Sequence, residues 1–343
     1  MHQFSLGLEG GRKLTGRLSI PNKPQISVSS LPLPLVICIH GGSYDSEYFD
    51  IDPQHSIFVL GELLQIPIVA IDRPGYGGST AYPDPKIRNE DLDRQGTTFA
   101  QEQGKYLHSI VLPALWKEFG PKSSASSMII LAHSIGGMMA VVAAASFTDA
   151  NTKKYPLSGM VISGIGCKSH MHESPGPKNG DHGNKNGQQG DGEKTHIFFD
   201  PTVKDTLMIN FPPKADQALL IDSKVPSYTE ALNKPVPLGE LQDVRTTWQT
   251  YWRSYAERVS VPLLYAVGGH DVFWDSSERS IAQFTDVFRT KSPRVESIVV
   301  RMAPHCIEMS LQGKAWLLRC LGFAVECTMA QKLEQETGKS SMQ

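Results

Sequence analysis

A serine, an aspartate and a histidine follow one another along the chain, and each stands directly after a run of apolar residues. Ser134 lies in LAHSIGG, Asp271 closes GGHD, and His305 closes APH. A serine attacks a carbonyl carbon when a base takes its proton, and an acid must hold that base in the right tautomer. The three residues therefore indicate acyl-transfer chemistry, with Ser134 as nucleophile, His305 as base and Asp271 as orienting acid.

The surroundings of Ser134 favour the nucleophile assignment. Met128–Ala132 reads as a buried strand and Ile135–Ser146 as a buried helix, so the serine falls in a tight strand–turn–helix junction. Such a turn strains the nucleophile's backbone and admits only small neighbours, usually in the pattern G-x-S-x-G. Ala132 replaces the first glycine here and is small enough for the turn. The helix N-terminus would favour negative charge beside Ser134.

Strands should bring the other two residues to the same place. Val261–Val267 precedes Asp271, and Ser297–Arg301 precedes His305. Open α/β sheets form their sites at the carboxyl ends of the strands. We therefore expect Ser134, Asp271 and His305 to meet at one edge of the sheet.

The motif HGGS at residues 40–43 follows another apolar strand, Leu35–Ile39. Glycines allow the backbone to approach a substrate oxygen closely, and N–H groups aimed at a forming oxyanion lower the barrier. We assign the oxyanion hole to the N–H groups of Ile135 and Gly42, although Ser43 could donate in place of Gly42. His40 is interpreted as a structural hydrogen-bonding residue.

Apolar runs alternate with helical patterns along most of the chain, which predicts an α/β fold with a doubly wound, mostly parallel sheet. An N-terminal hairpin precedes it. The further elements are the hairpin strands Phe4–Leu8 and Lys13–Ile20, the sheet strands Ile66–Ile71 and Gly159–Ser163, a helix over Gln54–Leu64, and a helix over Thr97–Phe119 that should stop at Gly120-Pro121.

One region interrupts this alternation. Residues 168–194 are rich in Gly, Asn, Lys and Asp, which predicts a flexible loop, and helical patterns resume from His196 to Arg258. We expect a catalytic core at 1–165 and 259–343, with an inserted helical cap at 166–258 that begins with this loop. Its histidines are not expected to bind a metal; they are His170, His172 and His182.

Composition excludes several classes of protein. The 343 residues carry a net charge of −2 and no basic stripe, which argues against nucleic acid as a partner. The five cysteines show no paired spacing, and we find no signal peptide and no stretch that could span a membrane. We expect a cytoplasmic protein without metal or organic cofactor, since G-x-G-x-x-G is absent after the first strand. Its oligomeric state stays open.

Together the motifs resemble the α/β-hydrolase superfamily, in its capped, single-domain branch. They are HGG at 40–42, DRPGYGGS at 72–79, AHSIGG at 132–137, GGHD at 268–271 and APH at 303–305. The sequence as a whole is also similar to fungal hydrolases, some of them from secondary-metabolite gene clusters. The resemblance implies that Asp72 shapes the core and takes no part in catalysis.

Residue identity separates the branches of this superfamily. Epoxide hydrolases and haloalkane dehalogenases resemble the chain but use an aspartate where Ser134 stands. Proline iminopeptidases typically continue HGG with Pro-Gly, whereas Ser43 and Tyr44 follow here. Ser43, Tyr44 and Trp274 are candidates for the substrate pocket. Three cap aromatics could join it or could pack in the cap interior: Phe211, Tyr251 and Trp252.

The motifs thus predict a serine hydrolase that cleaves an ester, lactone or thioester of a small hydrophobic molecule through an acyl-enzyme on Ser134. Two alternatives use the same residues. An acyltransferase or cyclase would pass the acyl group to an acceptor other than water. A binding protein would keep the fold and recognise a ligand without turnover.

Overall fold

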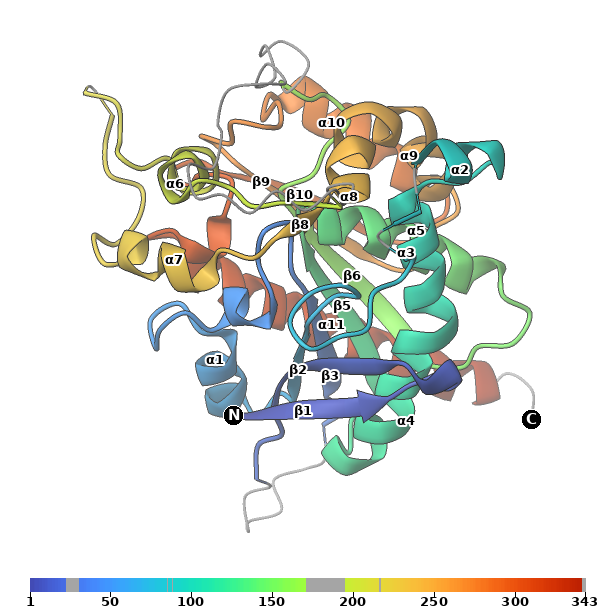
Figure 1. Ribbon diagram of the computed structural model, residues 1–343. Helices are drawn as coiled ribbons and strands as arrows, with labels where there is room; N and C mark the ends of the chain where they lie inside the picture. The colour runs from blue at the N-terminus through green and yellow to red at the C-terminus, as the bar shows by residue number, and fades with distance from the viewer. Residues whose placement is uncertain (23–30, 85, 88, 171–194, 216, 341–343) are drawn as a thin grey trace.

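One eight-stranded sheet runs through the molecule, with strand order β1-β2-β4-β3-β5-β6-β9-β10 (Figure 1). The computed structural model describes residues 1–22, 31–84, 86–87, 89–170, 195–215 and 217–340. Pairing is antiparallel from β1 to β2 and from β2 to β4, and parallel between all other neighbours. The strands are β1 (His2–Gly7), β2 (Lys13–Ser19), β3 (Pro34–Ile39), β4 (Ile68–Ile71), β5 (Ser127–His133), β6 (Leu157–Ser163), β9 (Leu263–Gly268) and β10 (Val295–Val300).

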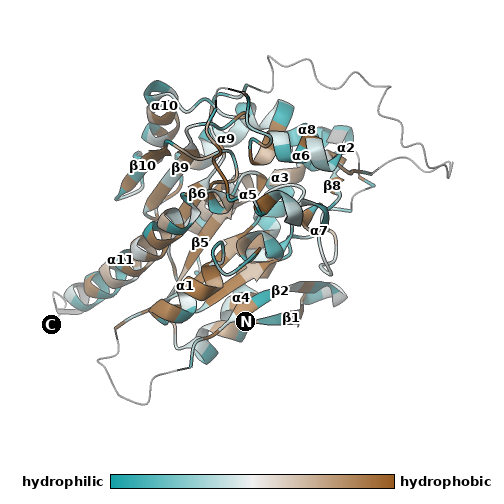
Figure 2. Ribbon diagram, turned by 90° about the vertical axis from the view of Figure 1, so that its left-hand side faces the viewer, coloured by the Kyte–Doolittle hydropathy of each residue, from teal (hydrophilic) through white to brown (hydrophobic). Residues whose placement is uncertain are grey.

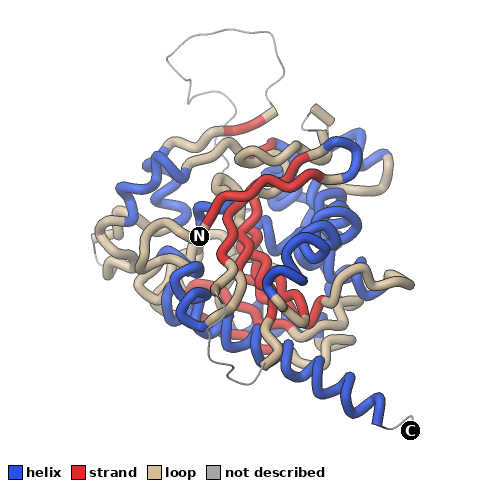
Figure 3. The backbone as a smooth tube through the Cα atoms, turned by 90° about the horizontal axis from the view of Figure 1, so that it is seen from below, coloured by secondary structure: helices blue, strands red, loops and turns tan. Residues whose placement is uncertain are grey.

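Helices cover both faces of the sheet, as the view in Figure 3 shows. Alternate residues of a strand point to opposite faces, so Leu35, Ile37 and Ile39 pack into one apolar cluster while Val36 and Cys38 pack into the other. Helices α1 (Ile57–Leu64) and α11 (Gly313–Ser340) contribute to the second cluster; the first is covered by α3 (Phe99–Tyr106), α4 (Leu112–Ser123), α5 (Ile135–Asp149) and α10 (Glu278–Phe288).

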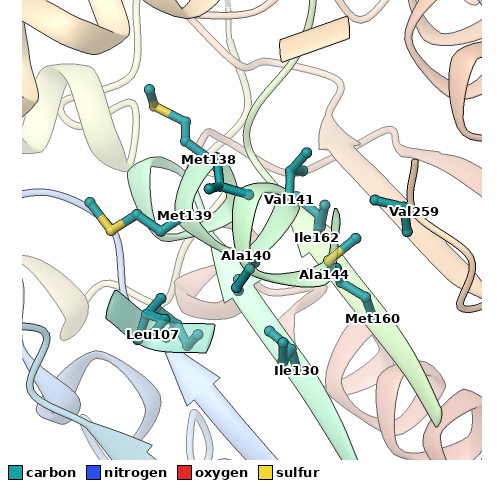
Figure 4. Packing of buried hydrophobic residues seen from close by; sticks show 14 of the residues in the cluster. Leu107, Ile130, Met138, Met139, Ala140, Val141, Ala144, Met160, Ile162 and Val259 are labelled. Atoms are coloured by element: carbon teal, nitrogen blue, oxygen red, sulfur yellow. The ribbon is translucent and has the colours of Figure 1, made fainter. Parts of the chain in front are cut away.

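The central helix α5 is buried on nearly all sides, because its sequence is apolar all round. Figure 4 shows Met138, Met139 and Val141 of this helix among side chains from the neighbouring strands and helices. Figure 2 likewise colours β5 and β6 toward the hydrophobic end of the scale. This packing fixes the N-terminal end of α5, where Ser134 lies, against the middle of the sheet.

A cap of short elements is inserted between β6 and β9. It holds α6 (Pro201–Met208), α7 (Thr229–Leu232), α8 (Leu238–Gln242), α9 (Trp248–Ala256) and a two-stranded sheet of β7 (His196–Ile197) with β8 (Val236–Pro237). The remaining elements are α2 (Asn89–Arg94), the 3-10 turns Glu9–Gly11, Ser46–Phe49, Val225–Tyr228 and Ile307–Met309, and the π-helical turns Leu107–Val111 and Asp243–Thr247.

The expected fold is confirmed: a mostly parallel doubly wound sheet, an N-terminal hairpin and an inserted helical cap. The exact domain limits stay a prediction. Within the described part of the chain, no helix combines the length and apolarity that a membrane span requires. Most of the expected loop 168–194, with His172 and His182, lies outside the described residues.

Two details differ from the expectations. The helix predicted to stop at Gly120-Pro121 continues as α4 to Ser123. Ser124 ends it in the left-handed conformation (φ 54°), and its N–H donates to the carbonyls of Gly120 and Pro121. A proline in the last turn loses only one helical hydrogen bond, so packing of Phe119 in the core prevails. The cap, expected to be helical, also contains the β7–β8 pair, in which Val236 is buried.

Candidate active site

Ser134 lies in the strained turn that the motif predicts. It joins β5 to α5 with φ 52° and ψ −126°, a conformation rare for a residue with a side chain. Two backbone bonds hold the turn: the Ser134 N–H donates to the Ser163 carbonyl at 2.8 Å, and Gly137 N–H donates to the Ser134 carbonyl at 2.7 Å. The side chain is therefore presented from the sheet edge instead of packing into α5.

The three sequence-predicted residues meet in one hydrogen-bonded chain. His305 Nε2 lies 3.0 Å from Ser134 Oγ, and His305 Nδ1 lies 2.8 Å from Asp271 Oδ2. An ionised carboxylate only accepts, so Nδ1 carries the proton and Nε2 is free to accept from the serine hydroxyl. His305 is 2 % exposed and the Asp271 side chain is fully buried, so water competes little for these bonds.

The backbone after β9 holds Asp271 in place. Its other oxygen, Oδ1, accepts from the N–H groups of Phe273 at 2.8 Å and Trp274 at 3.1 Å. The ring of Phe273 also stands edge-on to His305, with centroids 4.7 Å apart. Both carboxylate oxygens are thus hydrogen-bonded, and the Phe273 ring packs against the imidazole, so both groups are held in a fixed orientation.

The HGG loop after β3 lies against the serine turn, because β3 and β5 are neighbours in the sheet. A Cβ on Gly41 would stand 2.9 Å from Ser134 Cβ, and one on Gly42 would stand 2.9 Å from Ile135 Cδ1. At position 41 the neighbour is fixed next to the nucleophile's backbone, so glycine is needed there, whereas at position 42 the end of the Ile135 side chain could move aside. Gly42 and Ile135 line the same pocket as Ser134, whereas Ser43 is not among the described residues that line it, which favours Gly42 over Ser43 as the donor.

A buried carboxylate that the sequence reading missed ties together three side chains behind the site. Glu308 accepts hydrogen bonds from Tyr48 Oη at 2.5 Å, Ser163 Oγ at 2.8 Å and Trp316 Nε1 at 3.0 Å. His133, beside the nucleophile, lies next to this network, and burial with the charge of a neighbouring histidine holds its pKa well below the usual value. His133 is therefore a neutral structural partner. In the sequence, the only indication that Glu308 lies near the site is its position three residues after His305.

A pocket of about 70 Å³ opens above Ser134. Trp274 lines it, as expected, together with cap residues that the sequence reading did not single out. Their side chains carry no motif, since only the folded cap directs them inward. Besides the site residues, the lining consists of Phe199, Leu207, Met208, Leu241, Val244, Arg245 and Phe273.

Ser43 and Tyr44, expected at the pocket, lie behind the loop among buried groups. Ser43 Oγ donates to Asn233 Oδ1 at 2.9 Å, and Tyr44 is 3 % exposed beneath a lysine ammonium. The backbone of Ser43 has a positive φ of 65°. Both residues therefore connect the core to the cap.

The cap aromatics pack in the protein interior. Tyr251 Oη donates to Asp243 Oδ1 at 3.0 Å, and Trp252 lies against Phe284 of α10 with ring centroids 5.0 Å apart. Phe211 packs against the apolar cluster of α1 and α11. None of the three is among the described residues that line the pocket. Asp72 accepts hydrogen bonds from Thr15 Oγ1 of β2 and from the Ser46 N–H, and so links β2 to the segment after HGG.

A buried lysine of the cap binds the loop that follows HGG. Lys204 of α6 is 1 % exposed; its Nζ donates to the carbonyls of Ser43 at 2.6 Å and Leu232 at 2.9 Å and lies 3.8 Å from the Tyr44 ring centroid. Burial lowers the pKa of Lys204 to about 7. In the unfolded chain a lysine titrates near 10.4.

This difference predicts a pH-dependent stability. Between pH 7 and about 10 the unfolded chain binds the proton that the folded protein has released at Lys204, so stability rises with pH in this window. Relative to Lys204→Met, the free energy of unfolding of the wild type should rise by up to about 1.4 kcal/mol per pH unit above pH 7. Urea unfolding at pH 6, 7, 8 and 9 measures this. If the difference in the free energy of unfolding between the wild type and Lys204→Met is the same at all four pH values, the prediction is wrong.

Comparison with known proteins agrees with this architecture. The model of the alpha/beta hydrolase family matches residues 36–312, which span β3 to the loop after His305. No curated protein matches the chain by sequence.

Solved structures share the fold at low identity. A proline iminopeptidase from Mycobacterium smegmatis has a TM-score of 0.58 at 14% identity, covering 96% of this chain and 100% of its own. An esterase from Thermogutta terrifontis has a TM-score of 0.53 at 12% identity, covering 96% and 100%. An N-acyl homoserine lactonase bound to N-hexanoyl homoserine has a TM-score of 0.53 at 15% identity, covering 95% and 97%. Because the family model matches most of this chain, the chain belongs to the alpha/beta hydrolase family.

Proposed function

We propose that this protein is a serine hydrolase that cleaves a carboxylic ester, lactone or thioester of a small hydrophobic molecule. The observation that carries the proposal is the unbroken chain from Ser134 Oγ through the His305 ring to Asp271. A hydroxyl bonded to a neutral imidazole, whose other nitrogen is held by a carboxylate, is an activated nucleophile.

The reaction follows from this geometry. His305 Nε2 takes the hydroxyl proton as Ser134 Oγ attacks the carbonyl carbon, and the N–H groups of Gly42 and Ile135 stabilise the oxyanion. His305 then gives the proton to the leaving oxygen or sulfur, and the acyl group stays on Ser134. Water attacks the acyl-enzyme with His305 as base, which releases the acid and restores the serine.

The pocket supports a small apolar acyl group. Its lining is largely apolar, with side chains such as Leu207, Val244 and Trp274, and its volume is about 70 Å³. An esterase and a lactonase are among the proteins with this fold, which fits the bond type. The five cysteines are unpaired and four are buried, which fits the reducing cytoplasm that we propose for this enzyme.

A series of p-nitrophenyl esters tests the proposal. We expect hydrolysis of the acetate and butyrate, with kcat/KM at least about tenfold lower for the octanoate, because the longer acyl chain must fit a pocket of only about 70 Å³. Val244→Ala should raise the octanoate rate, and Val225→Ala, a buried cap valine outside the pocket lining, should not. Failure to hydrolyse any of the esters, or equal rates on all three, would contradict it.

Acyl transfer is the second candidate, and the burial of the base favours it. His305 is 2 % exposed, so an acceptor that fills the pocket could exclude water from the acyl-enzyme. Adding propanol to the butyrate assay distinguishes the two. Mass spectrometry should find mainly butyric acid from a hydrolase, and mainly propyl butyrate from a transferase.

A further inference from the structure

A fully buried arginine lies beneath the HGG loop, and the proposed mechanism does not use it. Arg73 follows β4 and is 0 % exposed. Its guanidinium is satisfied on every side: Nε donates to the His40 carbonyl at 2.8 Å, Nη1 to Gln103 Oε1 at 3.1 Å, and Nη2 to the Gly41 carbonyl at 3.1 Å. A planar cation with five donors is thus fixed directly against the loop.

The Gly41 carbonyl is the point where this arginine meets the proposed oxyanion hole. It accepts a second bond, from His40 Nδ1 at 2.7 Å. The backbone N–H of Arg73 donates to His40 Nε2 at 3.0 Å, so the imidazole proton must sit on Nδ1. Burial lowers the pKa of His40 well below its usual value, which keeps this ring neutral. Both of its nitrogens are therefore committed to holding the loop.

Peptide geometry transmits this hold to the pocket. The Gly41 carbonyl and the Gly42 N–H belong to one planar trans peptide, in which they point in opposite directions. Donors behind the loop that bind the Gly41 oxygen therefore aim the Gly42 N–H toward the side that Gly42 presents to the pocket. A cation on the oxygen also polarises the peptide and strengthens its N–H as a donor.

The cap supplies the anchor for this arginine. Glu240 of α8 binds Arg73 through both oxygens, at 2.8 Å to Nη1 and 2.9 Å to Nη2, and also accepts from Tyr76 Oη at 2.9 Å. Both charged side chains are 0 % exposed. A buried ion pair is often no more stable than apolar side chains of similar volume, so stability alone does not explain why this pair is here.

We propose that Arg73 is a positioning residue for the oxyanion hole: held by Glu240 of the cap, it orients and polarises the Gly41–Gly42 peptide. The inference rests on the proposed function, because it assumes that the Gly42 N–H meets a substrate oxyanion. The cap then helps to orient the oxyanion hole as well as forming part of the pocket wall.

A double variant tests this without leaving a lone buried charge. Arg73→Met/Glu240→Gln removes the cation and keeps an amide oxygen for Tyr76. We expect kcat for p-nitrophenyl butyrate to fall at least about tenfold, with KM within about threefold and an unchanged midpoint of the pH profile, because binding and the triad are left intact. The matched control Arg258→Met/Asp149→Asn removes an exposed ion pair and should keep kcat within about twofold.

The labelling rate with a fluorophosphonate, whose phosphoryl oxygen enters the same hole, should fall in parallel with kcat. A folded double variant with wild-type kcat and labelling rate would overturn the inference while leaving the hydrolase proposal standing. A wild type that neither labels nor turns over would instead overturn the hydrolase proposal. If thermal melting shows that the double variant does not fold, Glu240→Gln replaces it: a lower kcat at constant KM supports the inference, and an unchanged kcat overturns it.

Discussion

Ser134→Ala should lower ester turnover by about 10⁴-fold or more, to the level that the oxyanion hole and binding alone provide. The substitution removes the attacking oxygen, and the hydroxyl that it deletes has one partner of note, His305 Nε2 at 3.0 Å. Alanine tolerates the turn less well than glycine would, yet the strained backbone at φ 52° already carries a Cβ in the wild type. Steady-state hydrolysis of p-nitrophenyl butyrate measures the loss.

The matched control is Ser146→Ala, on the same helix but away from the pocket. Ser146 Oγ donates to the Val142 carbonyl inside α5, so its loss touches neither the triad nor the HGG loop. We expect wild-type turnover for this variant and similar melting temperatures for both. Turnover retained by a pure, folded Ser134→Ala protein would show that another group performs the attack.

Asp271→Asn should lower kcat by about 10³- to 10⁴-fold with little change in structure. The asparagine amide can donate to His305 Nδ1, which would shift the imidazole proton to Nε2 and leave no acceptor for the hydroxyl of Ser134. The new side chain still offers an oxygen to the N–H groups of Phe273 and Trp274, so the loop should keep its shape.

Asp275→Asn is the control for this prediction, because Asp275 lies four residues further along the chain and accepts hydrogen bonds from the Ser277 N–H and Ser280 Oγ instead of from the histidine. Rates with p-nitrophenyl butyrate across pH 6 to 9 measure both variants. A small effect at Asp271, no larger than that at Asp275, would mean that this carboxylate does not set the histidine tautomer.

The sheet and the three residues of the hydrogen-bonded chain were accessible from sequence because each is a local pattern. The parallel strands read as short apolar runs, and Ser134, Asp271 and His305 each follow the end of one such strand by at most five residues. Chain order then places them at the same sheet edge, without any knowledge of the packing. The confirmed hairpin β1–β2 is local in the same sense, since Gly10 and Gly11 take the positive φ of its turn.

The cap and the supporting contacts were less accessible, because they depend on which side chains meet after folding. Ser43 and Tyr44 adjoin the HGG motif in sequence, yet Lys204 and Asn233 of the cap draw both away from the pocket. Arg73 and Glu240 are separated by 167 positions, and nothing in either neighbourhood indicates the pair. The long helix α11 was also not predicted. Its apolar residues form one stripe that packs against the sheet, and the helix contains none of the motifs.

Labelling with a fluorophosphonate probe, followed by peptide mass spectrometry, tests the central claim most directly. We expect one adduct on the wild type, located on Ser134, and no adduct on Ser134→Ala or His305→Ala, because a serine without its base does not attack the probe at a comparable rate. A folded wild-type protein that takes no label, or one that is labelled at another residue, would contradict an activated Ser134 and with it the proposed hydrolase.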